Sequence, residues 1–217
     1  MRLLVLISGS GTNLQAIIDG VQSGVIPAQL VAVVSNRADA FGLERARKAG
    51  IPALCLDHKL FPERHLYDKA LVELISPFQP DLIVLAGFMR VLTPVFIDHF
   101  SPAIINIHPS LLPSYQGLHT HQRVLAAGDS RHGCTVHVVT AGLDEGPILG
   151  QASLAVRTEE SESQLAERVH VLEHQLYPAI ITAIAQKSIS LKEPPGEHYL
   201  RFAADADLHL LPMSGPC

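Results

Sequence analysis

The sequence predicts an α/β fold with an open, mostly parallel, twisted sheet, helices on both of its faces and an antiparallel strand in the C-terminal half. Two observations support this prediction. Short apolar runs such as 3–7 and 81–88 alternate along the chain with longer segments of helical periodicity. Several of these runs are apolar at nearly every position, which is typical of parallel strands covered by helices on both faces.

The first half of the chain supplies five predicted strands and three predicted helices. Continuous apolar runs predict strands at 3–7, 30–35, 52–56, 81–88 and 102–108. Apolar residues at helical spacing predict helices at 13–24, 39–50 and 63–78, and the first two end at a glycine that suits a helix exit.

The pattern changes after residue 108. Residues 109–122 are rich in proline and read as a loop, followed by a short helix over 122–128. Strands are predicted at 134–139 and 148–156, joined by a turn, so this pair is expected to be antiparallel. A long helix over 160–186 closes the pattern, and Pro178 is expected to kink or divide it. The prediction is a single domain over 1–192 with a poorly patterned tail, 193–217.

Composition excludes several classes of protein. Of 217 residues, 47% are hydrophobic and 17% charged, which fits a compact globular chain rather than a disordered one. A net charge of −5 disfavours general nucleic-acid binding. The longest apolar run, 82–89, is too short to span a membrane. Three scattered cysteines, Cys55, Cys134 and Cys217, form no C-x-x-C, so a reduced, cytoplasmic location is expected.

The segment SGSGTN, residues 8–13, joins the first predicted strand to the first predicted helix. Backbone N–H groups at a glycine turn and a helix N-terminus bind anions. The dinucleotide fingerprint G-x-G-x-x-G fails because Leu14 occupies its third glycine position, and no Gly-Lys-Ser/Thr follows. A site for one phosphate, beside the Thr12 hydroxyl and the Asn13 amide, is favoured over an ordinary capped turn.

The strand that ends in INIHPS carries Asn106 and His108 two residues apart, so both side chains point to one face. The C-terminal ends of strands line the ligand crevice in open α/β sheets. Satisfied polar groups near a sheet edge are an equal alternative on this stretch alone. Asp144, in the turn 142–147, is a carboxylate suited to orient and charge an imidazole, although turn chemistry alone also explains it.

Five histidines fall between residues 108 and 137: His108, His119, His121, His132 and His137. A zinc site needs three or four ligands in tight geometry. His119 and His121 share a face only in extended backbone, whereas the residues after Gly117 look like a helix entry. We therefore expect no metal. Ser110 also lacks the G-x-S-x-G setting of a serine hydrolase.

Longer segments contain these motifs: VLISGSGTNLQAIID, SNRADAFGLERARKAG, VLAGFMRVL, NIHPSLLPSYQGLHTH and HGCTVHVVTAGLDEGPILGQ. Together they resemble the folate-dependent formyltransferase family, in particular its phosphoribosylglycinamide formyltransferases, from about residue 2 to about residue 178. The Asn-x-His-Pro-Ser run and the Leu-Asp-Glu/Gly-Gly-Pro turn occur together in enzymes that use formyl-folates, and SGSGTN distinguishes this branch. The resemblance implies a Rossmann-like sheet.

The resemblance also implies the reaction and its residues. A formyl group would pass from 10-formyltetrahydrofolate to the amine of 5-phosphoribosylglycinamide in purine (IMP) biosynthesis. The reaction would need no metal, and neither nucleic acid nor a membrane is expected as a partner. A homodimer is one possible oligomeric state. The implied catalytic residues are Asn106, His108 and Asp144. The implied substrate-binding residues are Gly11, Thr12, Asn13 and Glu173. The implied folate-binding residues are Arg64, Met89, Arg90, Val91, Leu92, Thr140, Ala141, Gly142 and Leu143. His170 lies in the substrate segment without an assigned role.

The chemistry of these side chains suits formyl transfer independently of the resemblance. An amide N–H and a protonated imidazole are suitable donors to the oxyanion of a tetrahedral intermediate. A 10-formyltetrahydrofolate hydrolase would share this set with water as the acceptor. A methionyl-tRNA formyltransferase needs a longer chain. If the chain were a non-catalytic phosphate-binding α/β protein, the combination of Asn106, His108 and Asp144 would be a coincidence. Formyl release that needs no acceptor amine would favour the hydrolase.

Overall fold

A computed structural model describes residues 1–196, 199–204 and 210–212. Its internal contacts divide the chain into two compact units. The first contains residues 1–106 and 139–141, and the second contains residues 107–138 and the chain from 142 onward. A single domain over 1–192 remains a prediction.

The first unit is built on the parallel sheet that the sequence predicts, with strand order β3-β2-β1-β4-β5. The strands are β1 (Arg2–Ile7), β2 (Gln29–Ser35), β3 (Ala53–Cys55), β4 (Leu82–Leu85) and β5 (Ile104–His108), the last two residues of which belong to the second unit. Residues 3–7 are completely buried. A strand buried on both faces explains why its sequence is apolar without alternation.

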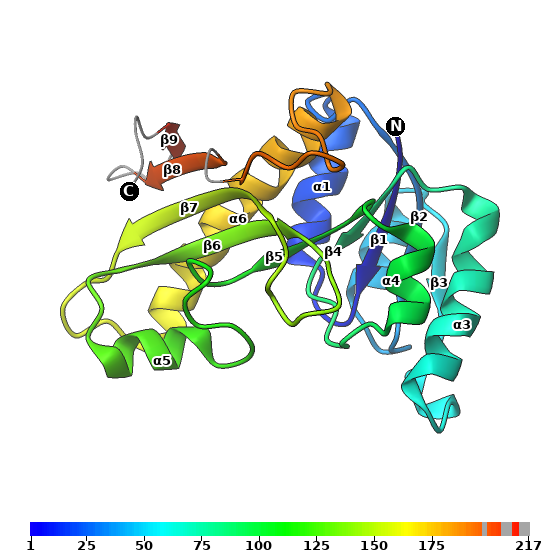
Figure 1. Cartoon of the computed structure of the whole chain (residues 1–217), viewed down its shortest axis with the longest axis horizontal. Helices are drawn as coiled ribbons and strands as arrows, with labels where there is room; N and C mark the ends of the chain where they lie inside the picture. The colour runs from blue at the N-terminus through cyan, green and yellow to red at the C-terminus, as the bar shows by residue number, and fades with distance from the viewer. Residues whose placement is uncertain (197–198, 205–209, 213–217) are drawn as a thin grey trace. The chain divides into compact units, whose positions relative to one another are not determined.

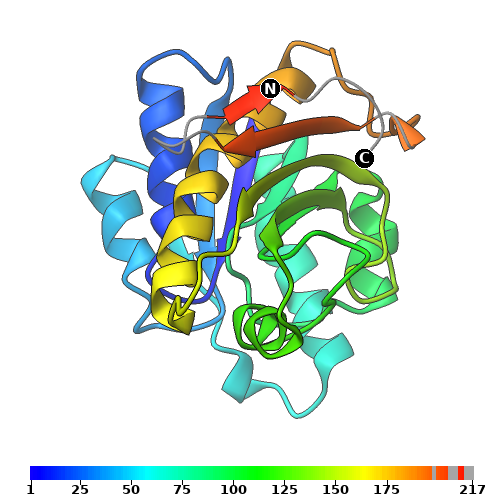
Figure 2. The same cartoon turned by 90° about the vertical axis from the view of Figure 1, so that its left-hand side faces the viewer.

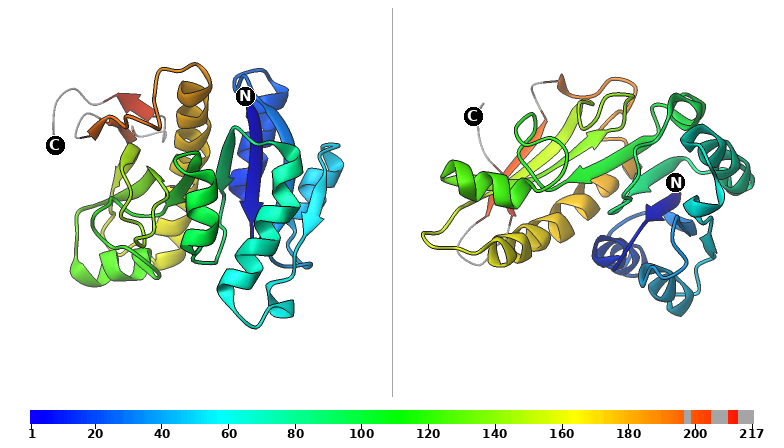
Figure 3. Two further views of the ribbon diagram at one scale, coloured as in Figure 1. Left: turned by 45° about the vertical axis from the view of Figure 1, so that its right-hand side comes forward. Right: turned by 90° about the horizontal axis from the view of Figure 1, so that it is seen from below.

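Helices cover both faces of this sheet. They are α1 (Thr12–Gln22), α2 (Gly42–Lys48), α3 (Arg64–Ile75) and α4 (Pro94–Phe100), with short 3₁₀ turns at His58–Leu60 and Ser76–Phe78. In Figure 3 the blue helices α1 and α2 lie on one side of the strands and the cyan and green helices α3 and α4 on the other. Leu4 and Leu6 share a core with Tyr67 and Leu71 of α3.

Helix α4 is absent from the sequence prediction. Its start carries a recognisable signal, because Thr93 has extended backbone and Pro94 occupies the first turn, where a missing N–H costs nothing. The helix has only seven residues, so too few turns repeat for its periodicity to stand out.

The second unit contains the predicted antiparallel pair, β6 (Arg131–Val138) and β7 (Ile148–Ala155). Helix α5 (Thr120–Ala127) follows the proline-rich loop, and α6 (Glu162–Ala185) packs on both strands (Figure 1). The expectation that Pro178 divides this helix is wrong, because α6 continues through it. Leu176, Tyr177, Ile180 and Ile181 around the proline are fully buried. At about 1.5–3 kcal/mol each, their burial outweighs the ~3 kcal/mol cost of an internal proline.

The tail contains two strands that its weak periodicity did not predict. Strand β8 (Leu200–Ala204) pairs in parallel with β7, and β9 (Leu210–Pro212) pairs antiparallel with β8 (Figure 2). Strand β8 covers an edge of β7 that would otherwise expose unpaired backbone groups. The other tail residues, 197–198, 205–209 and 213–217 with Cys217, lie outside the described residues. Among the residues described, no helix is long and apolar enough to cross a membrane.

Candidate active site

The second unit brings together His108 and Asp144, which lie on separate segments of the chain. The His108 Nδ1 atom is 3.4 Å from Asp144 Oδ2, and the two side chains are 8% and 10% exposed. The other ring nitrogen, Nε2, is 2.9 Å from the backbone carbonyl oxygen of Tyr115. Both nitrogens therefore face oxygen acceptors, an arrangement that suits a doubly protonated imidazole.

Asp144 occupies a backbone position that few residues tolerate. Its φ is 54°, in the left-handed region where short polar side chains such as Asp and Asn are favoured. The Gly117 N–H donates to Oδ2 over 3.0 Å, and the Gln116 amide donates to the Asp144 carbonyl over 3.4 Å. The turn chemistry that the sequence suggested and the carboxylate at the imidazole are thus properties of the same residue.

His137 is a further neighbour of the carboxylate that sequence reasoning missed. Its Nε2 lies 3.7 Å from Asp144 Oδ1, while its Nδ1 donates to the Val138 carbonyl oxygen over 3.0 Å. Burial lowers the pKa of His137 and outweighs the opposing effects of the Val138 carbonyl and the Asp144 charge. A neutral His137 with its proton on Nδ1 follows. The alternation of the polar residues Thr135 and His137 with apolar residues in β6 was the available signal.

Buried hydrogen bonds fix the loop that follows His108. The Thr135 hydroxyl donates to the Ser110 carbonyl over 2.6 Å and accepts from the Leu112 N–H over 3.0 Å. Further along, the Tyr115 hydroxyl donates to Asp129 over 2.5 Å, and the Arg123 guanidinium lies 5.2 Å from the centre of the Tyr115 ring. These contacts place the Tyr115 carbonyl against the His108 imidazole.

Two other histidines from the segment 108–137, His121 and His132, contact each other. His121 Nδ1 and His132 Nε2 are 2.9 Å apart, and His132 is 1% exposed. Within the described residues no group of three or more His, Cys, Asp or Glu side chains is arranged to hold a metal ion. Burial is the main cause that lowers the pKa of His121 and lowers that of His132 to about 4.

The depressed pKa of His132 predicts loss of stability in acid. Its ordinary value of 6.5 falls to about 4 on folding, so the unfolded chain binds more protons between these pH values. The contribution of His132 to the free energy of unfolding is therefore fully present above about pH 6.5, and up to about 3 kcal/mol of it is lost as the pH falls towards 4. Urea unfolding at pH 7 and pH 5 is expected to show a smaller difference for His132→Phe than for wild type. An unchanged difference would contradict this assignment, and His65→Gln, at an exposed histidine, is the control.

In the first unit, SGSGTN forms a tight loop against the start of α2. Gly11 has a φ of +70°, and a Cβ atom there would lie 2.7 Å from the Gly42 Cα. The Gly42 N–H donates to the Gly9 carbonyl over 3.0 Å. The Arg45 guanidinium donates to the Ser10 carbonyl over 2.9 Å and to the Gln15 side chain over 3.1 Å. The loop thus has no room for a side chain at Gly11, and the Arg45 guanidinium is bound to it.

The predicted folate segment, Met89–Leu92, is also in the first unit. The Met89 side chain is 72% exposed and Val91 47% exposed, whereas Leu92 is buried. The Arg90 guanidinium lies 4.5 Å from the centre of the Tyr67 ring. At the end of the segment, the Thr93 N–H donates to the buried Asp68 carboxylate over 2.5 Å. The exposed Met89 and Val91 side chains therefore belong to a segment whose backbone is held by residues of α3. Arg64, the first residue of α3, is exposed.

The remaining predicted site residues belong to both units. Asn106 is half-buried in β5 and is paired with Leu85 of β4 in the first unit, which also contains exposed Thr140 and Ala141. In the second unit, Leu143 is 51% exposed and Glu173 is 4% exposed on α6. His170 is exposed, and its ring stacks on that of His174 with 6.4 Å between centroids.

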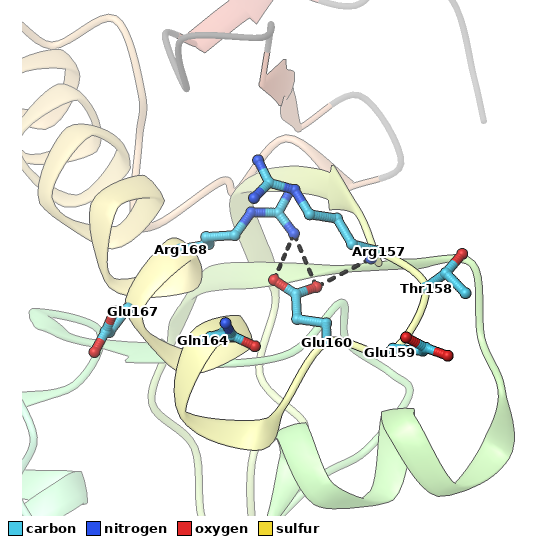
Figure 4. Close-up of a pocket in the computed structure, with 7 residues that line it drawn as sticks. All are labelled: Arg157, Thr158, Glu159, Glu160, Gln164, Glu167 and Arg168. Atoms are coloured by element: carbon cyan, nitrogen blue, oxygen red, sulfur yellow. Dashed lines mark hydrogen bonds and ion pairs between the residues drawn. The ribbon is translucent and has the colours of Figure 1, made fainter.

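A charged hollow of about 430 Å³ lies at the start of α6, away from these side chains in sequence (Figure 4). Arg168 donates to both oxygens of Glu160 over 2.8 and 2.9 Å, and the Arg157 N–H donates to the same carboxylate over 3.0 Å. Burial raises the pKa of Glu160, but these donors outweigh it and lower the pKa overall. The hollow is explained by an ion pair that fixes the turn into the helix, and it contains none of the predicted site residues.

Comparison with known proteins gives a consistent family assignment. The family model described as formyl transferase matches residues 1–181. A phosphoribosylglycinamide formyltransferase of Escherichia coli (strain K12) is 48% identical over 193 residues, which cover 89% of this chain and 91% of that protein. The crystal structure of glycinamide ribonucleotide transformylase 1 from Symbiobacterium toebii is 46% identical with a TM-score of 0.86, covering 88% of this chain and 90% of that one.

A second solved structure agrees with the first. The phosphoribosylglycinamide formyltransferase of Coxiella burnetii, determined in complex with CHES, is 49% identical with a TM-score of 0.83 and covers 86% of this chain and 88% of that one. The resemblance stated from the sequence motifs is confirmed by these matches. The chain belongs to the formyl transferase family.

Proposed function

We propose that this chain transfers the formyl group of 10-formyltetrahydrofolate to the amine of 5-phosphoribosylglycinamide in de novo purine biosynthesis. The observation that carries the proposal is the buried His108–Asp144 pair, in which both imidazole nitrogens face acceptors. The names of similar proteins, among them the phosphoribosylglycinamide formyltransferase of Escherichia coli, support the same reaction. The proposal includes a cytoplasmic location and small-molecule substrates only, and a homodimer remains a prediction.

The reaction follows from the chemistry of three side chains. The substrate amine attacks the formyl carbon, and the carbonyl oxygen becomes an oxyanion. This oxyanion accepts hydrogen bonds from the Asn106 amide and from the Nδ1–H of protonated His108, which forms an ion pair with Asp144 over 3.4 Å, whereas Nε2–H donates to the Tyr115 carbonyl. Collapse of the tetrahedral intermediate breaks the bond to the folate nitrogen, and His108 supplies the proton that this nitrogen needs. Asp144 stabilises the charged imidazole and accepts the proton that the amine loses, through water. The formyl donor is already activated, so every step uses only these groups.

The two substrates have separate binding segments in this proposal. The loop at Gly11, Thr12 and Asn13 holds the phosphate through backbone N–H groups, and Arg45 adds a positive charge beside it. Glu173 lies near the ribose or glycinamide. The folate contacts Arg64, the segment Met89–Leu92 and the segment 140–143. The exposed Met89 and Val91 side chains offer the apolar surface that a flat pterin requires.

The phosphate assignment predicts a selective effect of Gly11→Ala. The new Cβ would lie 2.7 Å from the Gly42 Cα, so the loop must shift, and its N–H groups would no longer point towards the phosphate. The KM for 5-phosphoribosylglycinamide is expected to rise at least tenfold, the effect of about 1.4 kcal/mol, while the KM for 10-formyltetrahydrofolate changes little. Steady-state kinetics with each substrate varied in turn measure both constants.

Gly24→Ala is the matched control. Gly24 has a φ of +77°, so the backbone strain is similar, but no atom lies within 4 Å of the new Cβ. Equal increases in both KM values for Gly11→Ala would contradict the phosphate assignment. Formyl release in the absence of the amine substrate would instead favour the hydrolase.

A further inference from the structure

The hydroxyl of Ser8 connects loops that follow three neighbouring strands of the first unit. Ser8 follows β1, Asn36 follows β2, and Met89 lies in the loop after β4, in a sheet where the strand order is β2-β1-β4. The Met89 N–H donates to Ser8 Oγ over 2.8 Å, and the Ser8 hydroxyl donates to Asn36 Oδ1 over 2.6 Å. Ser8 is 5% exposed and Asn36 is 2% exposed.

The direction of each hydrogen bond in this chain is determined. A backbone N–H can only donate, so Met89 occupies a lone pair of the Ser8 oxygen and the Ser8 proton goes to Asn36. His58 holds the backbone of Asn36 in place, because His58 Nδ1 lies 2.8 Å from the backbone carbonyl oxygen of Asn36. Removal of the Ser8 hydroxyl would leave the part-buried Met89 N–H and the buried Asn36 amide oxygen without this partner, which costs free energy.

The two ends of this chain belong to different substrate segments. Ser8 immediately precedes the loop that contains Gly11, Thr12 and Asn13, and Met89 is the first residue of the segment Met89–Leu92. We propose that Ser8 is a positioning residue that couples the phosphate loop to the folate segment, so that each substrate strengthens the binding of the other. This inference rests on the substrate assignments of the proposed function. Ordering one loop reduces the remaining entropy cost of ordering the other, which gives positive cooperativity.

Titration calorimetry tests this coupling without turnover. The dissociation constant of 5-phosphoribosylglycinamide is measured alone and with saturating tetrahydrofolate, the product of the donor. In wild type we expect tetrahydrofolate to tighten binding about fivefold or more, the lower end of typical couplings. In Ser8→Ala the ratio of the dissociation constants measured without and with tetrahydrofolate is expected to approach one. Tetrahydrofolate alone is expected to bind roughly tenfold more weakly, which corresponds to one lost hydrogen bond.

Two variants separate positioning from general stability. Ser8→Thr retains the hydroxyl and should restore most of the coupling ratio. Ser76→Ala removes another hydroxyl of the first unit, one that donates to the Val72 carbonyl at the C-terminal end of α3, and should leave both constants unchanged. If Ser8→Ala does not fold, Ser8→Cys, which keeps a weak donor of similar size, is used and should show a reduced ratio.

The outcomes distinguish this inference from the proposed function. Met89→Ala should weaken tetrahydrofolate binding if the folate assignment is right, and no change would overturn that assignment. If Met89→Ala weakens binding while Ser8→Ala and Ser8→Cys retain the wild-type ratio, the coupling is overturned and the folate assignment stands. A wild-type ratio of one would also overturn the coupling.

Discussion

Replacement of Asp144 by asparagine is expected to lower kcat about 100–1,000-fold, the usual effect of one lost electrostatic donor or partner. Asparagine keeps the shape and an oxygen that can accept from the Gly117 N–H, but it removes the negative charge 3.4 Å from His108. The imidazolium then loses its partner in the transition state, where it must donate to the oxyanion. Both KM values should change much less than kcat, because the loss is specific to the transition state.

The backbone of Asp144 makes this variant informative. At a φ of 54°, Asn is tolerated nearly as well as Asp, so the thermal midpoint should stay close to that of wild type. Glu145→Gln removes a charge from the next residue, which is exposed, and should retain full activity. A folded Asp144→Asn variant with kcat near wild type would refute the role, and the turn would then be only structural.

Replacement of His108 by glutamine is expected to lower kcat about 100–10,000-fold, because general acid catalysis is lost. Glutamine can still donate to the oxyanion, but it cannot deliver a proton to the departing folate nitrogen. His65→Gln, at an exposed histidine of α3, controls for the substitution itself. A His108→Gln variant within tenfold of wild type would show that another group supplies the proton.

The two substitutions should not add. If Asp144 acts through His108, the double variant should be about as slow as His108→Gln alone, since the carboxylate has no imidazolium left to stabilise. Single-turnover rates of wild type, both single variants and the double variant complete the cycle. Fully multiplicative losses would mean that Asp144 contributes only through its other proposed role, as acceptor of the amine proton through water, and not through the imidazole.

Sequence reasoning was most successful where the signal lies in neighbouring residues. The continuous burial of β1, the antiparallel pair β6 and β7 and the loop SGSGTN are all visible in local patterns. It failed where local patterns are short or overridden. Helix α4 has too few turns, and Pro178 lies in α6 because burial of the surrounding side chains outweighs its local cost. Strand β8 needs β7 as a partner before its own residues show any preference.

The candidate site divides in the same way. By itself the sequence determined that Asn106 and His108 share a face of one strand end, because side chains alternate with a fixed period along β5. Only the tertiary structure decided that Asp144 and the Tyr115 carbonyl lie against His108 and that His137 lies beside Asp144. It also decided that Ser8 joins Met89 to Asn36. Period is a property of consecutive residues, whereas these contacts depend on strand register and loop path, which the packing of distant segments sets.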